Sequence, residues 1–542
     1  MNLTFHGVRS ILAAFMITLS TGSIAQTVPF EVRLHPISIP NLGGLQSYAF
    51  GQANGKWLIV GGRLDGLHRR QPWASFDVAG HNNQLMVIDP VGLQVWTASL
   101  LSLPASIREQ LSSTNMEHYQ EGDYLYCLGG YGYSATQAAH TTYDKLTAIH
   151  VPNVINAVIN NTSFTSDIRQ ITDAQFQVTG GQLRKINDTY YLLGGQKFLG
   201  SYNPMGPNHG PGFTQVYTNA IRKFKLTDDG TTLVVNHLTA YVSSADLHRR
   251  DYNAEPQILP NGEQGVTMFS GVFQVHADIP YLSSVTVDST GFAVDAGFQQ
   301  YYNHYHCPTL PLYSSSQNEM HTVFFGGIAQ YYDQAGTLVQ DNNVPFVKTI
   351  ARVTREANGT MTEYKLPVEM PALLGAGAEF IPNINFPHFS NFVFELDSLT
   401  QDSVLVGYIY GGISSSQPNI FFVNDGSQSA ASAQIYAVYL SLPKSVGVDE
   451  INPSSNDPLQ FELYPNPSSG KLNLRFHLQE SQTVALRLHD AYGKLIESNE
   501  LLQVAIGENH IEHSFSELKS GGVYFVTLVV GDVEVRRKLI LE

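Results

Sequence analysis

The chain contains little cysteine. Only Cys127 and Cys307 occur among its 542 residues. The repeat described below places them in the second and fifth of six units, on opposite sides of a ring, whereas a disulfide needs Cα atoms within about 7 Å of each other. Export would permit a disulfide, but we predict two free, buried thiols.

Charged residues are also scarce. They make up 14% of the chain, and the formal net charge is −16. The sequence has no block of lysine and arginine, which argues against a nucleic-acid partner because such proteins need a basic face. The 28 tyrosines and 28 phenylalanines favour a β-rich extracellular protein instead.

No apolar run is long enough to span a membrane. A short run from Ile11 to Ser20 lies near the N-terminus, whereas a spanning helix needs about 20 residues. A small-x-small sequence at 23–25 follows it. Residues 1–26 are therefore predicted to be a signal peptide, and we expect no transmembrane segment in the mature chain.

Common catalytic signatures are missing as well. The sequence has no nucleophile elbow, phosphate-binding loop, His-Glu-x-x-His motif or EF-type calcium loop. His304 and His306 stand two apart on an extended segment, so both could face one metal ion. No third ligand follows at a fixed spacing, and we expect neither a metal site nor a cofactor.

What the sequence does contain is a repeat, a short apolar run that ends in two glycines. Six copies occur, the fourth with one glycine lost, at 56–62, 123–130, 189–195, 265–271, 321–327 and 406–412. They recur about every 70 residues, and such self-similarity indicates a repeat architecture. Around the first copy, strands are predicted at 45–52, 56–60, 84–89 and 94–98, with Asn54-Gly55 as a tight turn.

This pattern resembles the Kelch repeat, which has a hydrophobic run, Gly-Gly, a loop, a strand ending in Asp-Pro and then an aromatic residue such as Trp96. The glycines and the strand order match, whereas Trp96 has no counterpart in most units. Four-stranded antiparallel units around an axis form a β-propeller. We predict an all-β fold with a six-bladed Kelch-like propeller over 27–445, in which the N-terminal strand 29–35 completes the sixth blade and hides its edge.

A polar linker, 446–459, leads to a different domain at 460–542. Four of its motifs occur in the order of the type IX secretion system C-terminal sorting domain, which it resembles: 461–470, 490–494, 518–525 and 536–541. Alternating strands joined by Gly-containing turns predict a small β-sandwich, for which a generic adhesion-type sandwich is the alternative. The resemblance implies the type IX machinery as a partner and release or attachment at the outer cell surface.

The loops after the glycines are long, whereas the turns between first and second strands are mostly short. In an up-and-down meander these long loops share one face with the blade-to-blade connections, so we predict one elaborated face and one plain face. Long loops on a rigid scaffold usually carry binding. The candidate ligand-binding residues are Arg63, His68, Arg249, Arg250, Asp251, Tyr252, Tyr301, His304, His306 and Tyr331.

These residues suggest a polar, aromatic pocket at the mouth of the central channel. Arg249 and Arg250 could bind a carboxylate bidentately, although polar residues there could equally hydrogen-bond neighbouring blades. We predict a protein that binds a glycan or another protein. The alternative is a sugar-processing enzyme with mutarotase- or epimerase-like chemistry, similar to six-bladed Kelch-like sialic-acid mutarotases, with Glu117 and Glu255 as acid–base candidates.

Overall fold

The computed structural model describes residues 28–442 and 457–541, apart from positions 211, 402, 458, 492–493, 517–520 and 532. The chain divides into two compact units on either side of residue 443. The predicted signal peptide lies outside the described residues, and so does most of the predicted linker. Within the described ranges, no helix is long and apolar enough to cross a membrane.

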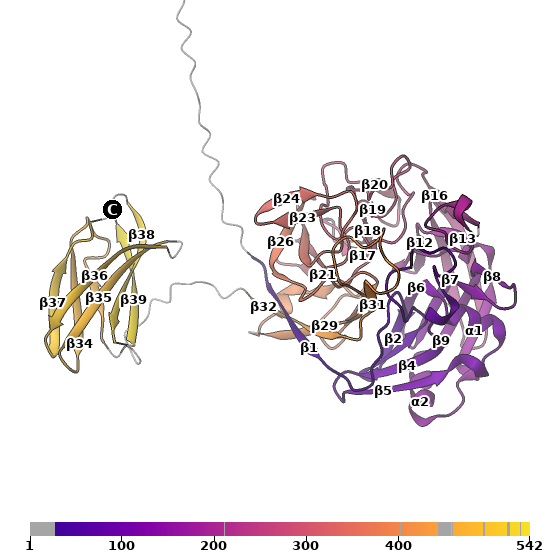
Figure 1. The fold of residues 1–542 in the computed structure, drawn as a ribbon, viewed down its shortest axis with the longest axis horizontal. Coiled ribbons are helices and arrows are strands. Elements are labelled where there is room, and N and C mark those ends of the chain that lie inside the picture. Colours follow the sequence, from indigo (N-terminus) through magenta and orange to yellow (C-terminus); the bar gives the residue numbers. More distant parts are fainter. Residues whose placement is uncertain are drawn as a thin grey trace, which may run out of the picture. The chain divides into compact units, whose positions relative to one another are not determined.

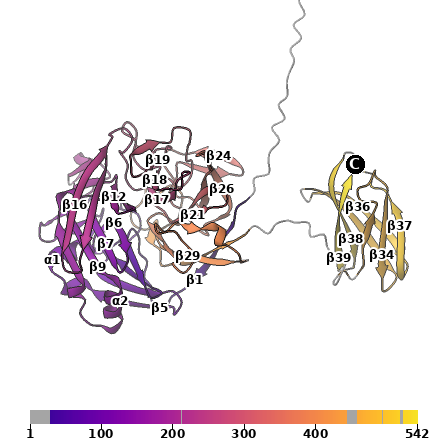
Figure 2. The same ribbon diagram turned by 180° about the vertical axis from the view of Figure 1, so that it is seen from behind.

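The first unit contains six antiparallel sheets that follow one another around a ring (Figures 1 and 2). Blade one contains β2 (Ala49–Ala53), β3 (Lys56–Val60), β4 (Gln84–Asp89) and β5 (Gln94–Ser99). Blade two contains β6 (Thr114–Glu121), β7 (Tyr124–Ser134), β9 (Lys145–His150) and β10 (Ile168–Thr172), with β8 (Ala139–Thr142) paired to the end of β7. Blade three contains β11 (Gln182–Ile186), β12 (Thr189–Leu193), β15 (Ala220–Asp228) and β16 (Leu233–Val242).

The other three blades repeat this order. Blade four contains β17 (Asn253–Ile258), β18 (Gln264–Phe269), β19 (Val285–Val287) and β20 (Phe292–Val294). Blade five contains β21 (Thr309–Ser314), β22 (Glu319–Phe325), β25 (Thr349–Arg355) and β26 (Met361–Glu369), and the short β28 (Phe394–Glu395) pairs with β21. Blade six contains β27 (Ala378–Pro382), β29 (Val404–Gly411), β32 (Ile435–Ser441) and β1 (Glu31–Ile37). The prediction of a six-bladed propeller is confirmed.

The N-terminal strand closes the ring. β1 runs antiparallel to β32 along its whole length, from Glu31 opposite Ser441 to Ile37 opposite Ile435. Phe30, just before β1, is 1% exposed and belongs to a core that spans blades five and six. The predicted closure of the sixth blade is therefore present, and it covers an edge that would otherwise be open to other strands.

The glycine pairs join neighbouring blades. Gly129 and Gly130 have φ values of 60° and 87°, and a Cβ on Gly129 would lie 1.9 Å from the Val178 carbonyl oxygen. The Gly130 N–H donates to that oxygen at 3.0 Å. Because Val178 precedes the inner strand of blade three, the pair fixes the distance between two blades. The same bond recurs from Gly62 to Ser113, Gly195 to Arg249, Gly327 to Leu374 and Gly412 to Leu45.

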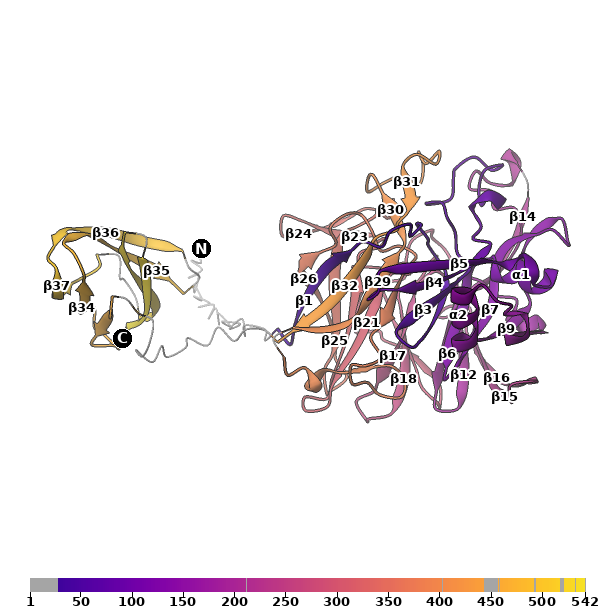
Figure 3. The same cartoon turned by 90° about the horizontal axis from the view of Figure 1, so that it is seen from below.

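The two ends of the propeller differ (Figure 3). One end, the hairpin face, carries the loops after the glycine pairs and the blade-to-blade connections. Its loops form hairpins of their own: β13 (Gln196–Gly200) with β14 (Phe213–Tyr217), β23 (Tyr331–Gln334) with β24 (Thr337–Gln340), and β30 (Ile413–Ser415) with β31 (Ser429–Ala431). The opposite end, the turn face, has short turns with two exceptions, 151–167 and 383–403. One face is thus the more elaborated, as predicted.

Helices are few among the described residues. α1 (Ala105–Leu111) precedes β6, and α2 (Val151–Asn160) packs its buried side against blades one and two. Cys127 and Cys307 are both buried and free, which confirms the prediction of two unpaired thiols.

The second unit has two antiparallel sheets. One contains β33 (Glu462–Tyr464), β34 (Leu472–Leu478) and β37 (Gly507–His513). The other contains β36 (Leu495–Val504), β35 (Gln482–Asp490), β38 (Gly522–Val530) and β39 (Val533–Leu541). Alternate residues of both sheets, among them Leu474 and Leu486, meet in one buried core, as in the predicted sandwich.

Candidate functional site

The centre of the ring encloses a cavity of about 880 Å³. Its wall is formed by the innermost strands β2, β6, β11, β17, β21 and β27, and residues of loops on both faces contribute to its lining. This volume lies within the range of about 300–1,000 Å³ that is typical of small-molecule sites. We refer to the cavity as the channel.

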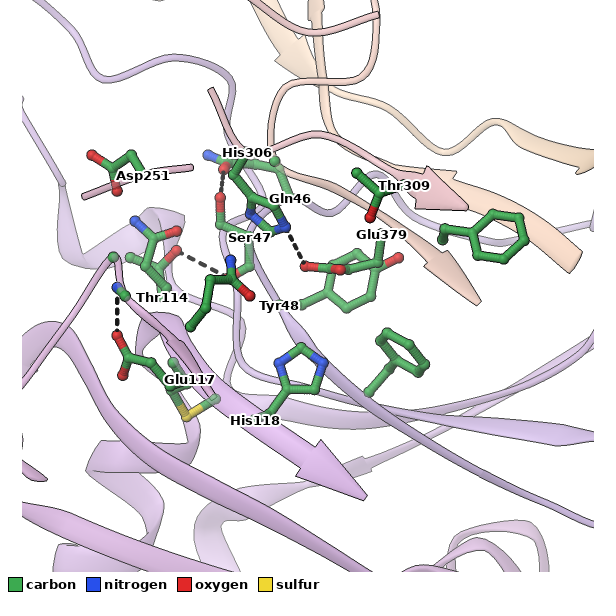
Figure 4. Close-up of a pocket in the computed structure, with 18 of the residues that line it drawn as sticks. Gln46, Ser47, Tyr48, Thr114, Glu117, His118, Asp251, His306, Thr309 and Glu379 are labelled. Carbon is green, nitrogen blue, oxygen red and sulfur yellow. Dashed lines mark hydrogen bonds and ion pairs between the residues drawn. The ribbon is translucent and has the colours of Figure 1, made fainter. Parts of the chain in front are cut away.

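Four charged side chains from neighbouring blades meet on the channel wall. Arg184 of β11 donates from Nη2 to Oε1 of Glu255 on β17 at 3.2 Å. His306, in the connection before β21, lies with Nε2 3.2 Å from Oε1 of Glu379 on β27. Figure 4 shows His306 and Glu379 pointing toward each other, with the His118 ring of β6 facing the same space. The site thus offers two ion pairs and a second imidazole ring, that of His118.

Burial and the ion pairs set the pKa values of these groups. Burial alone would lower the pKa of His306, but the Glu379 carboxylate raises it above its ordinary value. Burial would raise the pKa of Glu379, yet His306 holds it below the ordinary value. Burial lowers the pKa of His118 to about 4, helped by the nearby Arg184 cation. At neutral pH His118 is therefore an uncharged ring beside a charged pair.

Glu117 is the most perturbed carboxyl group that lines the channel. It is 2% exposed, and its Oε1 accepts the Gly181 N–H at 2.8 Å. Among the described residues, Oε2 has no hydrogen-bond partner. Burial raises the pKa of Glu117 to about 8, and the negative charge of Asp251 adds to the effect. A carboxyl group that stays protonated near pH 7 can act as a general acid.

Two further pairs lie toward the hairpin face. Arg250 bonds Asp251 through Nη1 and donates from Nε to the Tyr217 hydroxyl at 2.9 Å. Arg63 holds Asp65 through two bonds, Nε to Oδ1 at 2.7 Å and Nη2 to Oδ2 at 2.5 Å. Both arginines line the channel.

Aromatic rings surround His68 at this end of the channel. Its ring stacks on Phe76 at 5.8 Å between centroids and meets Tyr202 edge-on at 4.8 Å and Phe421 at 6.3 Å. Burial lowers the pKa of His68 to about 4. All four rings line the channel, so this end combines apolar surface with an uncharged imidazole.

Three hairpin-face loops meet above these rings. Arg70 of the first-blade loop donates from Nε to the Met205 sulfur at 3.1 Å and bonds the Phe422 carbonyl through Nη1. Asn424 donates from Nδ2 to the Leu67 and His68 carbonyls at 2.7 and 3.0 Å. Loops of blades one, three and six are therefore tied together at this end.

Of the predicted ligand-binding residues, five line the channel: Arg63, His68, Arg250, Asp251 and His306. The acid–base candidates Glu117 and Glu255 line it too. Glu255 pairs with Arg184, not with Arg250.

The other five predicted residues lie outside the channel lining. Arg249 is 1% exposed and donates to the Ser270 and Ser283 carbonyls, so it does not form a fork with Arg250 toward the channel. The Tyr252 hydroxyl donates to the Leu193 carbonyl at 2.9 Å. His304 is fully buried between the Gln300 carbonyl and the Gln330 N–H. Tyr301 and Tyr331 stack edge-on at 5.1 Å away from the channel.

His304 and His306 consequently do not share a site. Among the described residues, no group of three or more His, Cys, Asp or Glu side chains could hold a metal ion.

Sequence reasoning did not single out Arg184 or Glu379. Each lies on an innermost strand, and no local motif distinguishes it from other charged residues. The available signal was a charged residue within the strand that precedes the glycine-repeat strand, as in β11 and β27, because inner strands turn alternate side chains toward the axis.

The comparison with known families decides the role of the second unit. Residues 462–542 match the family described as secretion system C-terminal sorting domain. The second unit is a sorting domain. It marks the protein as one that is secreted or attached to the cell surface through the type IX secretion system, as the sequence motifs predicted.

The propeller has no comparable match. No curated protein matches the chain. Among solved structures, the chain is similar to YjhT with 10% identity and a TM-score of 0.39, over 75% of this chain and 99% of that one. It is also similar to a glycoside hydrolase family 43 arabinoxylan arabinofuranohydrolase from Bacillus subtilis (11%, TM-score 0.29, 92% and 95%) and to the WD40 domain of SCAP from fission yeast (8%, TM-score 0.26, 94% and 98%).

Proposed function

We propose that the protein is an exported propeller that binds a carbohydrate in its central channel. The observation that carries the proposal is the channel itself, about 880 Å³ of space lined by aromatic rings and by the Arg184–Glu255 and His306–Glu379 pairs. Rings can pack against the apolar faces of a sugar, and charged groups make strong hydrogen bonds to its hydroxyls. The sorting domain delivers this site to the cell exterior.

The test is proton NMR of the purified protein with a panel of sugars and sugar acids. We expect saturation transfer from the protein to a bound sugar, and loss of that signal in His306→Ala. Tyr301→Phe is the matched control, because Tyr301 lies outside the channel lining. Absence of transfer for the whole panel, or transfer that His306→Ala leaves unchanged, would contradict the proposal and favour a protein partner.

A second candidate is acid–base catalysis on the bound sugar. The observation that favours it is Glu117, a buried carboxyl group with a raised pKa and one oxygen without a partner among the described residues. The same NMR experiment, followed over time, separates the two candidates. New anomeric or product signals that disappear in Glu117→Gln would indicate an enzyme, whereas broadening without new signals would indicate binding alone.

We also propose that the blades are Kelch repeats and that residues 1–26 are a signal peptide. The first proposal is supported by the glycine pairs, which take up the same left-handed conformation and the same bond to the next blade in five units. The second is supported by the sorting domain, because a chain that crosses the outer membrane must first cross the inner one.

A further inference from the structure

The cations that line the channel share one property: each is already bonded to an acidic side chain. The pairs are Arg63–Asp65, Arg184–Glu255, Arg250–Asp251 and His306–Glu379. Two of these pairs lie toward the hairpin face and two lie further along the wall, and two of their members are strongly buried, with Arg63 2% and Glu255 6% exposed. Among the described residues, the lining contains no lysine and no arginine without such a partner.

Three further titratable groups of the wall carry no charge at neutral pH. His68 and His118 have pKa values lowered to about 4 by burial, so both rings are uncharged at neutral pH. Glu117 is protonated there because burial raises its pKa to about 8. Asp123, exposed on the turn between β6 and β7, adds a negative charge at the turn-face end.

We propose that the channel selects an electrically neutral carbohydrate and rejects the corresponding sugar acid. This inference rests on the proposed function and names the class of sugar. A carboxylate that entered the channel would have to displace an internal carboxylate from its cation or lose its hydration without a partner, and an unpaired buried charge is costly. Loss of the proton from His306 would make the wall more negative and strengthen the exclusion.

A neutral sugar meets no such obstacle. A carboxylate has about four lone-pair sites, and the Arg184–Glu255 contact uses one bond to Glu255 Oε1. The acceptor sites that remain on such paired carboxylates suit hydroxyl donors. The pairs also hold these acceptors in fixed positions, so that little side-chain freedom is lost when a sugar binds.

The experiment uses sugars that differ only in charge: glucose with glucuronic acid, galactose with galacturonic acid, and mannose with mannuronic acid. Each pair differs only at C6. We measure binding to the purified full-length protein by saturation-transfer NMR at pH 7. We expect the neutral member of the recognised pair to bind at least about tenfold more tightly, because the acid has no free cation to offset its desolvation.

A variant makes the inference testable by gain of binding. Glu255→Gln keeps the shape of the side chain but leaves Arg184 without its carboxylate, so the uronic acid should gain about tenfold in affinity, the size of one charge-assisted hydrogen bond. Glu363→Gln is the matched control, since Glu363 is a half-buried carboxyl group outside the channel lining that accepts the Tyr301 N–H at 2.6 Å. It should leave the preference unchanged.

The outcomes separate the two proposals. A uronic acid that binds the wild-type protein as tightly as its neutral partner, and loses binding in His306→Ala, would overturn the neutral preference while leaving the channel as the binding site. Binding of neither member of any pair would count against the channel as a sugar site, and the inference would fall with it.

Discussion

At the scale of the residue, Gly129 shows why the repeat ends in glycine. Its φ of 60° lies in the left-handed region, and the Val178 carbonyl occupies the place of a Cβ. Gly129→Ala should lower the free energy of unfolding by about 2–6 kcal/mol, because strained backbone and overpacking each cost about 1–3 kcal/mol. Urea unfolding measures the difference.

Gly55→Ala is the control for that variant. Gly55 also has a positive φ, 73°, but no atom lies within 4 Å of its would-be Cβ. Only the backbone strain of about 1–2 kcal/mol should remain. Equal losses in the two variants would show that the blade-to-blade contact is unimportant.

Glu117 gives a prediction that depends on pH. Its pKa of about 8 exceeds the ordinary 4.5, chiefly because it is buried; the charge of Asp251 raises the pKa further and that of Arg222 lowers it. In the unfolded chain the Glu117 carboxyl group ionises above pH 4.5, whereas in the folded protein it stays protonated up to about pH 8. The contribution of Glu117 to the free energy of unfolding therefore falls as pH rises from 4.5 to 8.

Glu117→Gln should therefore stabilise the protein at pH 7 by up to about 3 kcal/mol and change little at pH 4. Urea unfolding at both pH values checks this, because Gln can keep the bond from the Gly181 N–H. An equal change in the free energy of unfolding at pH 4 and pH 7 would mean that the pKa of Glu117 is not raised in the folded state.

At the scale of the element, β1 is held by its neighbours in blades five and six. Phe30 packs edge-on to His321 of β22 at 5.7 Å and lies under the Arg352 guanidinium of β25 at 5.8 Å. Phe30→Ala should cost about 3–5 kcal/mol, as buried Phe→Ala changes do. Val28→Ala, at a side chain that is 46% exposed, should cost little, and thermal unfolding compares the two.

The strands were largely predictable from the sequence, and their exceptions have physical reasons. Strands 56–60 and 84–89 match β3 and β4 residue for residue, because apolar runs bounded by turn residues leave little choice. The first strand was expected from Leu45 but begins at Ala49. Gln46 instead exchanges backbone bonds with Arg63 on the hairpin face, a contact between distant residues that no local pattern carries.

The site was predictable only in part, because contacts between residues far apart in the chain leave no local sequence pattern. His306 and Arg250 stood out because they lie in polar connections between blades. Their partners differ in how far away they lie along the chain. Asp251 is adjacent to Arg250, whereas Glu379 belongs to blade six and His306 lies in the connection that leads into blade five. Pairing across the ring depends on the angle between blades, which a single sequence does not encode locally. Arg249 fits the alternative that polar residues here bond neighbouring blades, because its guanidinium donates to the Ser270 and Ser283 carbonyls.

At the scale of the whole molecule, the two units have separate cores and separate tasks. The sorting domain has its own buried cluster, and the channel is lined only by residues of the propeller. Deletion of 462–542 should leave the protein inside the cell, because the sorting domain is removed while the channel remains. Immunoblots of cell and medium fractions measure the distribution.

A reciprocal fusion is the control for that deletion. The same residues, attached to an unrelated periplasmic passenger, should carry it out of a cell with type IX secretion. A truncated chain that still reached the medium at the level of the full chain would show that another segment directs export.

The closure of the ring by β1 has a consequence for the order of events during export. β1 pairs with β32, so the strand that leaves the ribosome first meets its partner only after nearly the whole propeller has followed. Contacts between such distant residues form slowly because a long loop must close before they contribute. Until then two sheet edges stay unpaired. The ring can close only where both ends of the propeller are present together.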